Sequence, residues 1–174
     1  MEYIFTLKYQ LAEQDCDQDA LVERLGAAGC DDGLVGVGQP GRLALEFSRE
    51  ADSAEEAVRT ALADVKHAVP SATLIEASPD LVGLTDVADF VGVSRQAMRK
   101  LMLAHRATFP LPVHDGSASI WHLAEVLDWL KAYRNYQIDP GLLEVARMAL
   151  EVNIAKEAIR HPVSSQGRRD LLTA

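Results

Sequence analysis

The sequence predicts an α+β protein whose strands lie in the first 80 residues and whose helices dominate the remainder. Apolar residues alternate with a period of two at 3–9 and 42–48, which is typical of strands with one buried face. They recur at helical spacing between 54 and 65, and after residue 80 helical patterns replace strands. The 174 residues are 48% hydrophobic and 25% charged, an ordinary globular composition with room for one domain or two small ones.

Residues 1–78 predict a first module of mixed strands and helices. Asp17 or Asp19 is expected to cap its first helix, and Ser53 with Glu56 forms a capping box that opens the second. The order βαββαβ is that of a ferredoxin-like module, an antiparallel sheet with two helices on one face. The expected elements are a strand at 3–9, a helix at 19–28, strands at 33–38 and 42–48, a helix at 53–67 and a strand at 72–77.

Residues 84–103, LTDVADFVGVSRQAMRKLML, predict two short helices joined by a tight turn, after a hinge at 78–80. Thr85 and Ser94 are expected to cap the two helices, and Gly92 suits a left-handed turn. In the second helix, the expected buried stripe consists of Ala97, Met98 and Leu101.

The exposed face of the second helix has the side chains that read DNA. Arg pairs with guanine, Gln with adenine and Lys with phosphate, and a helix N-terminus receives phosphates through its N–H groups. Residues 94–106 contain three Arg, one Lys and no acidic residue, although the whole chain has a net charge of −9. The expected DNA-binding residues of this segment are Thr85, Ser94, Arg95, Gln96, Arg99, Lys100, His105 and Arg106.

Residues 107–134 continue with a hairpin signal at Asp115-Gly116 and a helix containing Trp129, which, like Trp121, we expect in the core. The order LTDVADFVGVSRQAMRKLM…FPLPVHDGSASIWHLAEVLDWLKAY resembles the winged helix-turn-helix of excisionase, AlpA-type and MerR-like DNA-binding domains. The resemblance covers 82–134. It implies that residues 94–100 enter the major groove and that the wing at 115–119 follows the minor groove or the backbone.

The wing differs from those of this family, which usually carry Arg or Lys. It offers His114, Ser117, Ser119 and His122, with Asp115 at its tip, and the first three of these are the expected DNA contacts of the wing. Fewer phosphate contacts lower the affinity of one domain, which favours a dimer on two half-sites. A helix at 139–161 has an unusually broad apolar stripe, so we expect homodimerisation through 140–160, followed by a flexible tail at 162–174.

Several function classes are disfavoured. Residues 1–80 carry a net charge of −10 and residues 81–134 a net charge of +1, which suggests two modules with different partners. No catalytic motif is present, the five histidines and two cysteines lack ligand spacing, and no segment is long and apolar enough to span a bilayer. We therefore expect no enzyme, no cofactor, no metal and no membrane association, in a cytoplasmic protein.

The sequence thus predicts a sequence-specific protein that binds double-stranded DNA, as a transcriptional regulator or an excisionase-like factor. The acidic first module is expected to bind an effector or a partner protein. An alternative is a protein-interaction adaptor or antitoxin-like protein that uses the same modules to bind a basic partner. A third hypothesis makes the first module a small-molecule sensor.

Overall fold

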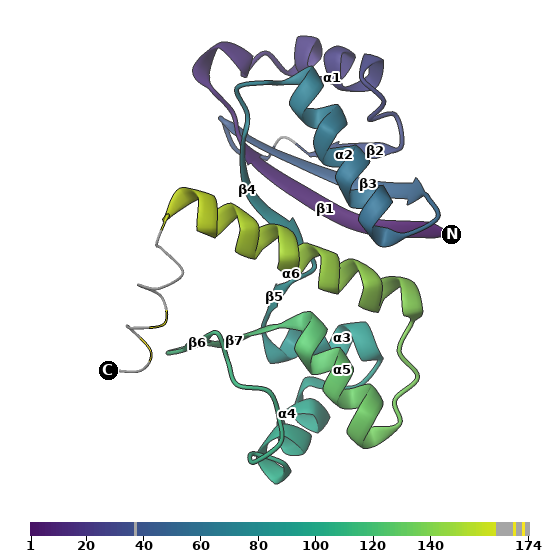
Figure 1. The fold of residues 1–174 in the computed structure, drawn as a ribbon, viewed down its shortest axis with the longest axis vertical. Coiled ribbons are helices and arrows are strands. Elements are labelled where there is room, and N and C mark those ends of the chain that lie inside the picture. The colour runs from purple at the N-terminus through teal and green to yellow at the C-terminus, as the bar shows by residue number, and fades with distance from the viewer. Residues whose placement is uncertain (37, 163–168, 170–171, 173–174) are drawn as a thin grey trace.

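The computed structural model describes residues 1–36, 38–162, 169 and 172, and within them it contains six α-helices and two antiparallel sheets (Figure 1). The first half holds β1 (Glu2–Gln10), a 3₁₀ turn (Glu13–Asp15), α1 (Gln18–Ala27), β2 (Gly33–Gly36), β3 (Arg42–Glu50), α2 (Ala54–Ala68) and β4 (Thr73–Ser78). The second half holds β5 (Leu81–Val82), α3 (Leu84–Val91), α4 (Arg95–Ala104), β6 (His114–Asp115), β7 (Ser119–His122), α5 (Leu123–Arg134) and α6 (Pro140–Arg160).

The first sheet has the strand order β2-β3-β1-β4, and all neighbouring strands are antiparallel. Its register pairs Phe5 with Phe47 and Leu7 with Leu45, so the alternating apolar residues share one buried face. Helices α1 and α2 lie on that face (Figure 1). The six elements form within a few residues of their expected positions. The expected strand at 33–38 is described as β2 only to Gly36, and residue 37 lies outside the described residues.

The helix caps of the first module follow local side-chain chemistry. The Asp17 carboxylate accepts a hydrogen bond from the Ala20 N–H at 3.1 Å, so Asp17 rather than Asp19 begins α1. The Ser53 hydroxyl accepts from the Glu56 N–H at 3.1 Å and begins α2 as expected. The capping box is altered, because the Glu56 carboxylate accepts from the N–H of Asp52 rather than that of Ser53.

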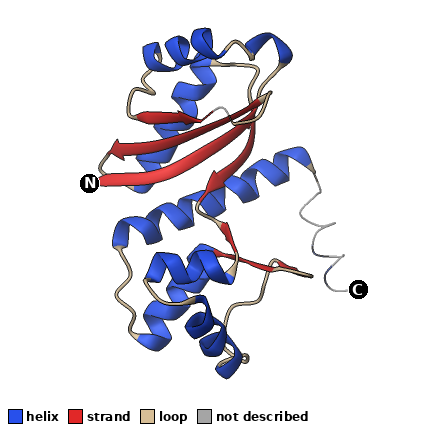
Figure 2. Cartoon of the chain, turned by 180° about the vertical axis from the view of Figure 1, so that it is seen from behind, coloured by secondary structure: helices blue, strands red, loops and turns tan. Residues whose placement is uncertain are grey.

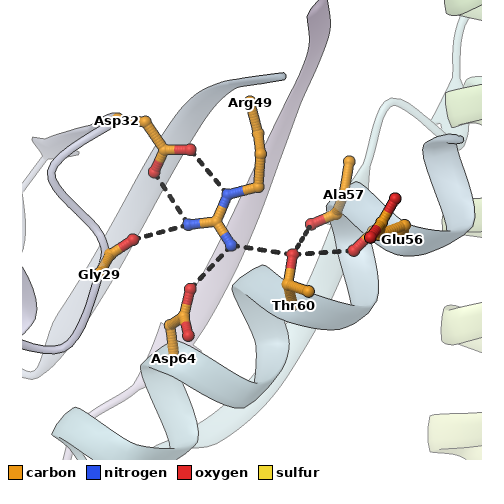
Figure 3. A network of polar contacts seen from close by, with 7 residues as sticks. All are labelled: Gly29, Asp32, Arg49, Glu56, Ala57, Thr60 and Asp64. Atoms are coloured by element: carbon orange, nitrogen blue, oxygen red, sulfur yellow. Dashed lines mark hydrogen bonds and ion pairs between the residues drawn. The ribbon is translucent and has the colours of Figure 1, made fainter. Parts of the chain in front are cut away.

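A buried arginine joins the sheet to α2 and to the loop that follows α1 (Figure 3). Arg49 follows Phe47 on the buried face of β3, and its guanidinium donates two hydrogen bonds to Asp32, at 2.7 and 2.9 Å. A further bond reaches Asp64 on α2 at 2.7 Å, and others reach the Thr60 hydroxyl and the Gly29 carbonyl. Hydrogen bonding to Asp32 and Asp64 raises the pKa of Arg49. The network explains how a charged residue is accommodated among apolar neighbours.

The second sheet has the order β5-β7-β6. Strand β5 pairs with β7 through Leu81↔His122 and Val82↔Trp121, and β6 pairs with β7 through His114↔Ile120. The hairpin β6–β7 was expected, whereas β5 was not, because two residues carry no readable periodicity. The segment that we expected to be a hinge is therefore short and held at both ends, since β4 ends at Ser78 and β5 begins at Leu81.

Helix α6 lies between the first sheet and the helices of the second half (Figure 2). Val145 and Ala149 belong to the hydrophobic cluster of the first sheet, while Leu143 and Ala146 belong to the cluster formed by α3, α4, α5 and the second sheet. The broad apolar stripe that led us to expect a dimer interface is thus largely used within one chain. The homodimer remains a prediction, and this stripe no longer supports it. The predicted tail at 162–174 falls mostly outside the described residues.

Candidate nucleic-acid interface

The two helices α3 and α4 are joined by the turn that the sequence predicts. Gly92 ends α3 with φ 72°, a left-handed conformation that glycine adopts without steric cost. The N–H of Val93 donates to the Ala88 carbonyl at 2.9 Å and closes the turn. The Ser94 hydroxyl then accepts from the Ala97 N–H at 3.1 Å and begins α4. These contacts fix the direction in which α4 leaves α3.

The prediction that Thr85 caps α3 is wrong. Gly83 occupies the cap position, and the Asp86 carboxylate accepts a hydrogen bond from its N–H at 2.8 Å. Thr85 is exposed in the first turn of α3. The helix begins at Leu84 because the carboxylate of Asp86, at the third helical position, accepts from the N–H of the cap residue Gly83, so Thr85 lies inside the first turn.

Helix α4 has one buried side and one exposed side. Met98 is fully buried, and Leu101 and Met102 pack partly against the same hydrophobic cluster. Ala97, which we expected in the buried stripe, is exposed, and Met102 is partly buried instead. The four polar side chains within α4 that we expected to contact DNA are all exposed: Arg95, Gln96, Arg99 and Lys100.

The basic side chains on the exposed side of α4 form no ion pair within the described residues. Among the residues that the structure describes, no carboxylate pairs with Arg95, Arg99 or Lys100. In contrast, Lys8 and Arg49 in the first module are each paired with an acidic side chain. A basic side chain that is not held by a neighbouring acid can bind an external anion without first breaking an ion pair.

His105 and Arg106 differ in their surroundings. Helix α4 ends at Ala104, and His105 is its partly buried C-cap, with its ring 5.9 Å from that of Trp129. Arg106 is exposed in the following turn and lines a small groove of about 210 Å³ together with Leu111 and Ser119. The groove brings the end of α4 next to the hairpin, so Arg106 lies on the surface that α4 and the hairpin share, whereas His105 is partly buried against Trp129.

The hairpin presents few free polar groups. The Ser119 hydroxyl donates to the Asp115 carboxylate at 2.9 Å, so it is engaged within the hairpin. The His114 ring lies over Gly116, where an added Cβ would stand 2.5 Å from His114 Nε2. Ser117 is exposed at the turn. The hairpin therefore contributes one free hydroxyl and an imidazole edge, and no permanent positive charge.

An aromatic cluster holds the hairpin against α5. The Trp121 indole N–H donates to the Pro110 carbonyl at 3.1 Å, and Phe109 contacts both Trp121 and Trp129 edge to face, at 6.0 and 5.1 Å. Both tryptophans are buried, as the sequence predicts. The cluster positions the base of the hairpin relative to α4.

A buried polar joint, which sequence analysis missed, fixes this half of the chain to the first sheet. Asp80 is 1% exposed, and its Oδ1 lies 2.7 Å from Nδ1 of His122. The Asn153 amide donates to the other Asp80 oxygen at 2.8 Å and forms two hydrogen bonds with the backbone of Ala77, at 2.8 and 2.9 Å. Asn153 is the only polar residue buried in described α6, and an amide within an apolar stripe is the signal that would have revealed the joint.

No protein-family model, no curated protein and no solved structure matches this chain. Within the described residues, no three His, Cys, Asp or Glu side chains are grouped to hold a metal ion. None of the described helices combines the length and the apolar character needed to cross a bilayer. The case for a function therefore rests on the geometry and charge of α4 and its neighbours.

Proposed function

We propose that this protein binds double-stranded DNA sequence-specifically, with α4 in the major groove. In this proposal α3, α4, α5 and the β5-β7-β6 sheet form a winged helix-turn-helix, and residues 1–78 form a ferredoxin-like module that binds an effector or a partner. The observation that carries the proposal is the exposed, unpaired polar side of α4 directly after a tight left-handed glycine turn. That combination provides a rigid helix with free donors for base edges and phosphates.

The four side chains form two rows along α4. Arg95 and Arg99 are four residues apart and share one row, and Gln96 and Lys100 share the adjacent row. In the first row, each guanidinium reads a guanine through O6 and N7, and in the second, Gln96 reads an adenine while Lys100 contacts phosphate. Because these roles need side chains that reach outward from one helix, they fit α4 better than the scattered basic residues of α2 or α5.

The hairpin offers few phosphate contacts, which limits the affinity of one copy of the protein for DNA. With Ser119 engaged and His114 folded over Gly116, phosphate contacts come mainly from α4 and Arg106. The net charge of −9 further lowers non-specific affinity. We therefore keep a homodimer on two half-sites as part of the proposal, because two weak readers gain affinity when both engage.

The test uses the purified full-length protein and DNA selected from a random pool, with binding measured by fluorescence anisotropy. We expect Arg95→Ala, Arg99→Ala and Lys100→Ala each to weaken binding about ten-fold or more. Lys131→Ala removes the same charge from an exposed position on α5 and serves as the matched control. The proposal fails if no sequence is enriched, or if the three variants bind as tightly as the control.

The alternative, a protein-interaction module, has one observation in its favour. Leu111 is 82% exposed beside the hairpin, where a DNA-binding wing usually carries positive charge. DNA binding through Lys and Arg releases counterions and therefore weakens as the salt concentration rises. In the same experiment, the absence of any salt-dependent binding of the protein to DNA favours this alternative.

A further inference from the structure

A cavity of about 580 Å³ opens between the outer face of the first sheet and the second half of the chain. Residues of β1 and β3 line one side, α3 lines the opposite side, and the segment of β5 and the start of α6 complete the wall. Figure 1 shows β5 running between the four-stranded sheet and α3. The volume falls within the range of about 300–1,000 Å³ that is typical of small-molecule sites.

Three large hydrophobic side chains remain exposed and line this one cavity. Ile4 from β1 is 58% exposed, Leu81 from β5 is 46% exposed and Phe90 from α3 is 42% exposed. None of them belongs to either hydrophobic cluster of the fold. These three apolar side chains come from separate elements and line the same cavity, but they are not part of the protein core. They therefore provide a surface for an apolar ligand.

The charge of the cavity wall is predominantly negative. Six acidic residues line it against one basic residue, Lys8, which is already paired with Glu76 at 3.0 Å. Asp86 and Asp139 cap α3 and α6, where their carboxylates accept hydrogen bonds from the N–H groups of Gly83 and Leu142 at 2.8 and 2.7 Å. The carboxylates of Glu2 and Glu46 make no hydrogen bond or ion pair with any residue that the structure describes. A cleft with apolar walls and charges of one sign concentrates the field of those charges.

We propose that this cavity binds a small organic cation with a compact apolar body, such as a hydrophobic primary amine. The apolar body packs against Ile4, Leu81 and Phe90, and the ammonium group pairs with Glu46 or the neighbouring carboxylates. Phe90 also contributes an aromatic ring to the cavity wall, and such a ring attracts a cation that lies over its face. An anion of the same shape is excluded by the same charges. The site does not require DNA binding, so its test is independent of the function proposed above.

The test compares three compounds of one shape with the full-length protein: 1-adamantanamine, which is a cation, 1-adamantanol, which is neutral, and 1-adamantanecarboxylate, which is an anion. Dissociation constants are measured by ligand-observed NMR titration at pH 7. We expect the amine to bind about ten-fold more tightly than the alcohol, because its charge lies close to several carboxylates, and the carboxylate not to bind. Equal binding of the three compounds, or no binding of the amine at millimolar concentration, overturns the proposal.

Matched variants locate the site. Phe90→Ala removes part of the apolar wall and Glu46→Gln removes one charge, and each is expected to weaken binding of the amine at least about three-fold. Leu34→Ala truncates an exposed apolar side chain and Glu23→Gln removes one negative charge, both at positions that do not line the cavity, and they are expected to leave binding unchanged. If the control variants weaken binding as much as the cavity variants, the amine binds the acidic surface in general and the proposal is wrong. Circular dichroism of each variant confirms that a loss of binding is not a loss of fold.

Discussion

Replacing Asn153 with alanine tests whether the buried joint holds the two halves of the molecule together. The substitution removes two hydrogen bonds to the Ala77 backbone and one to the Asp80 carboxylate, all between 2.8 and 2.9 Å. A hydrogen bond between neutral groups contributes about 1 kcal/mol, and one to a charged group about 1.5–3 kcal/mol. Because Asp80 and Ala77 stay buried without replacement partners, we expect the free energy of unfolding to fall by about 3–5 kcal/mol.

The measurement is urea unfolding followed by tryptophan fluorescence and by circular dichroism. Trp121 and Trp129 report on the second half, and circular dichroism reports on the whole chain, so non-coincident transitions would show that the halves have become uncoupled. The control is Ile154→Ala, at the next position of α6, where the side chain is 57% exposed and the expected loss is below about 1 kcal/mol. If Asn153→Ala costs no more than Ile154→Ala, the joint does not stabilise the fold.

Three further predictions concern thiols, acid and charge. Burial raises the pKa of the Cys30 thiol to about 11, so we expect a thiol reagent at pH 8 to modify only the exposed Cys16 in the native protein and both in denaturant; equal reaction rates in the native protein would contradict this. The hydrogen bond from Ser71, followed by the one from Arg24, lowers the pKa of Asp15. A lowered pKa stabilises the fold at pH values above the unfolded-state pKa of about 4, so Asp15→Asn is expected to reduce the free energy of unfolding at pH 7. The difference in unfolding free energy between the two proteins should shrink as the pH falls below about 4. Urea unfolding at several pH values measures this difference, and a difference that does not change with pH would refute the prediction. Replacing exposed acidic side chains of the first module with glutamine is expected to tighten binding to random DNA at low salt, measured by anisotropy, because it lowers the overall repulsion; unchanged affinity would mean that this charge has no electrostatic effect at the interface. The exposed acidic side chains to be replaced are Glu13, Glu23 and Glu55.

The residues of α4 show how far local pattern determines a candidate site. Gly92 and Ser94 predict the turn and the start of α4 because both effects act within a few residues of chain. The same reasoning fails at Thr85, where a carboxylate one residue further on caps the helix from the third position. It also fails at His105, whose contact with Trp129 depends on a helix more than twenty residues away.

The sequence by itself determined the order of the strands and helices other than β5, the buried face of the long strands β1 and β3, and the basic side of α4, because alternation, helical spacing and capping are local properties. Only the tertiary structure decided what α6 packs against, that Asp80, His122 and Asn153 meet, and that Ile4, Leu81 and Phe90 line one cavity. Apolar periodicity shows that a helix face is buried but not by which partner, since hydrophobic burial has no direction. Contacts such as Asp80 with His122 and Asp80 with Asn153, 42 and 73 positions apart, form only when the chain has folded back on itself, and they leave no spacing in the sequence from which to predict them.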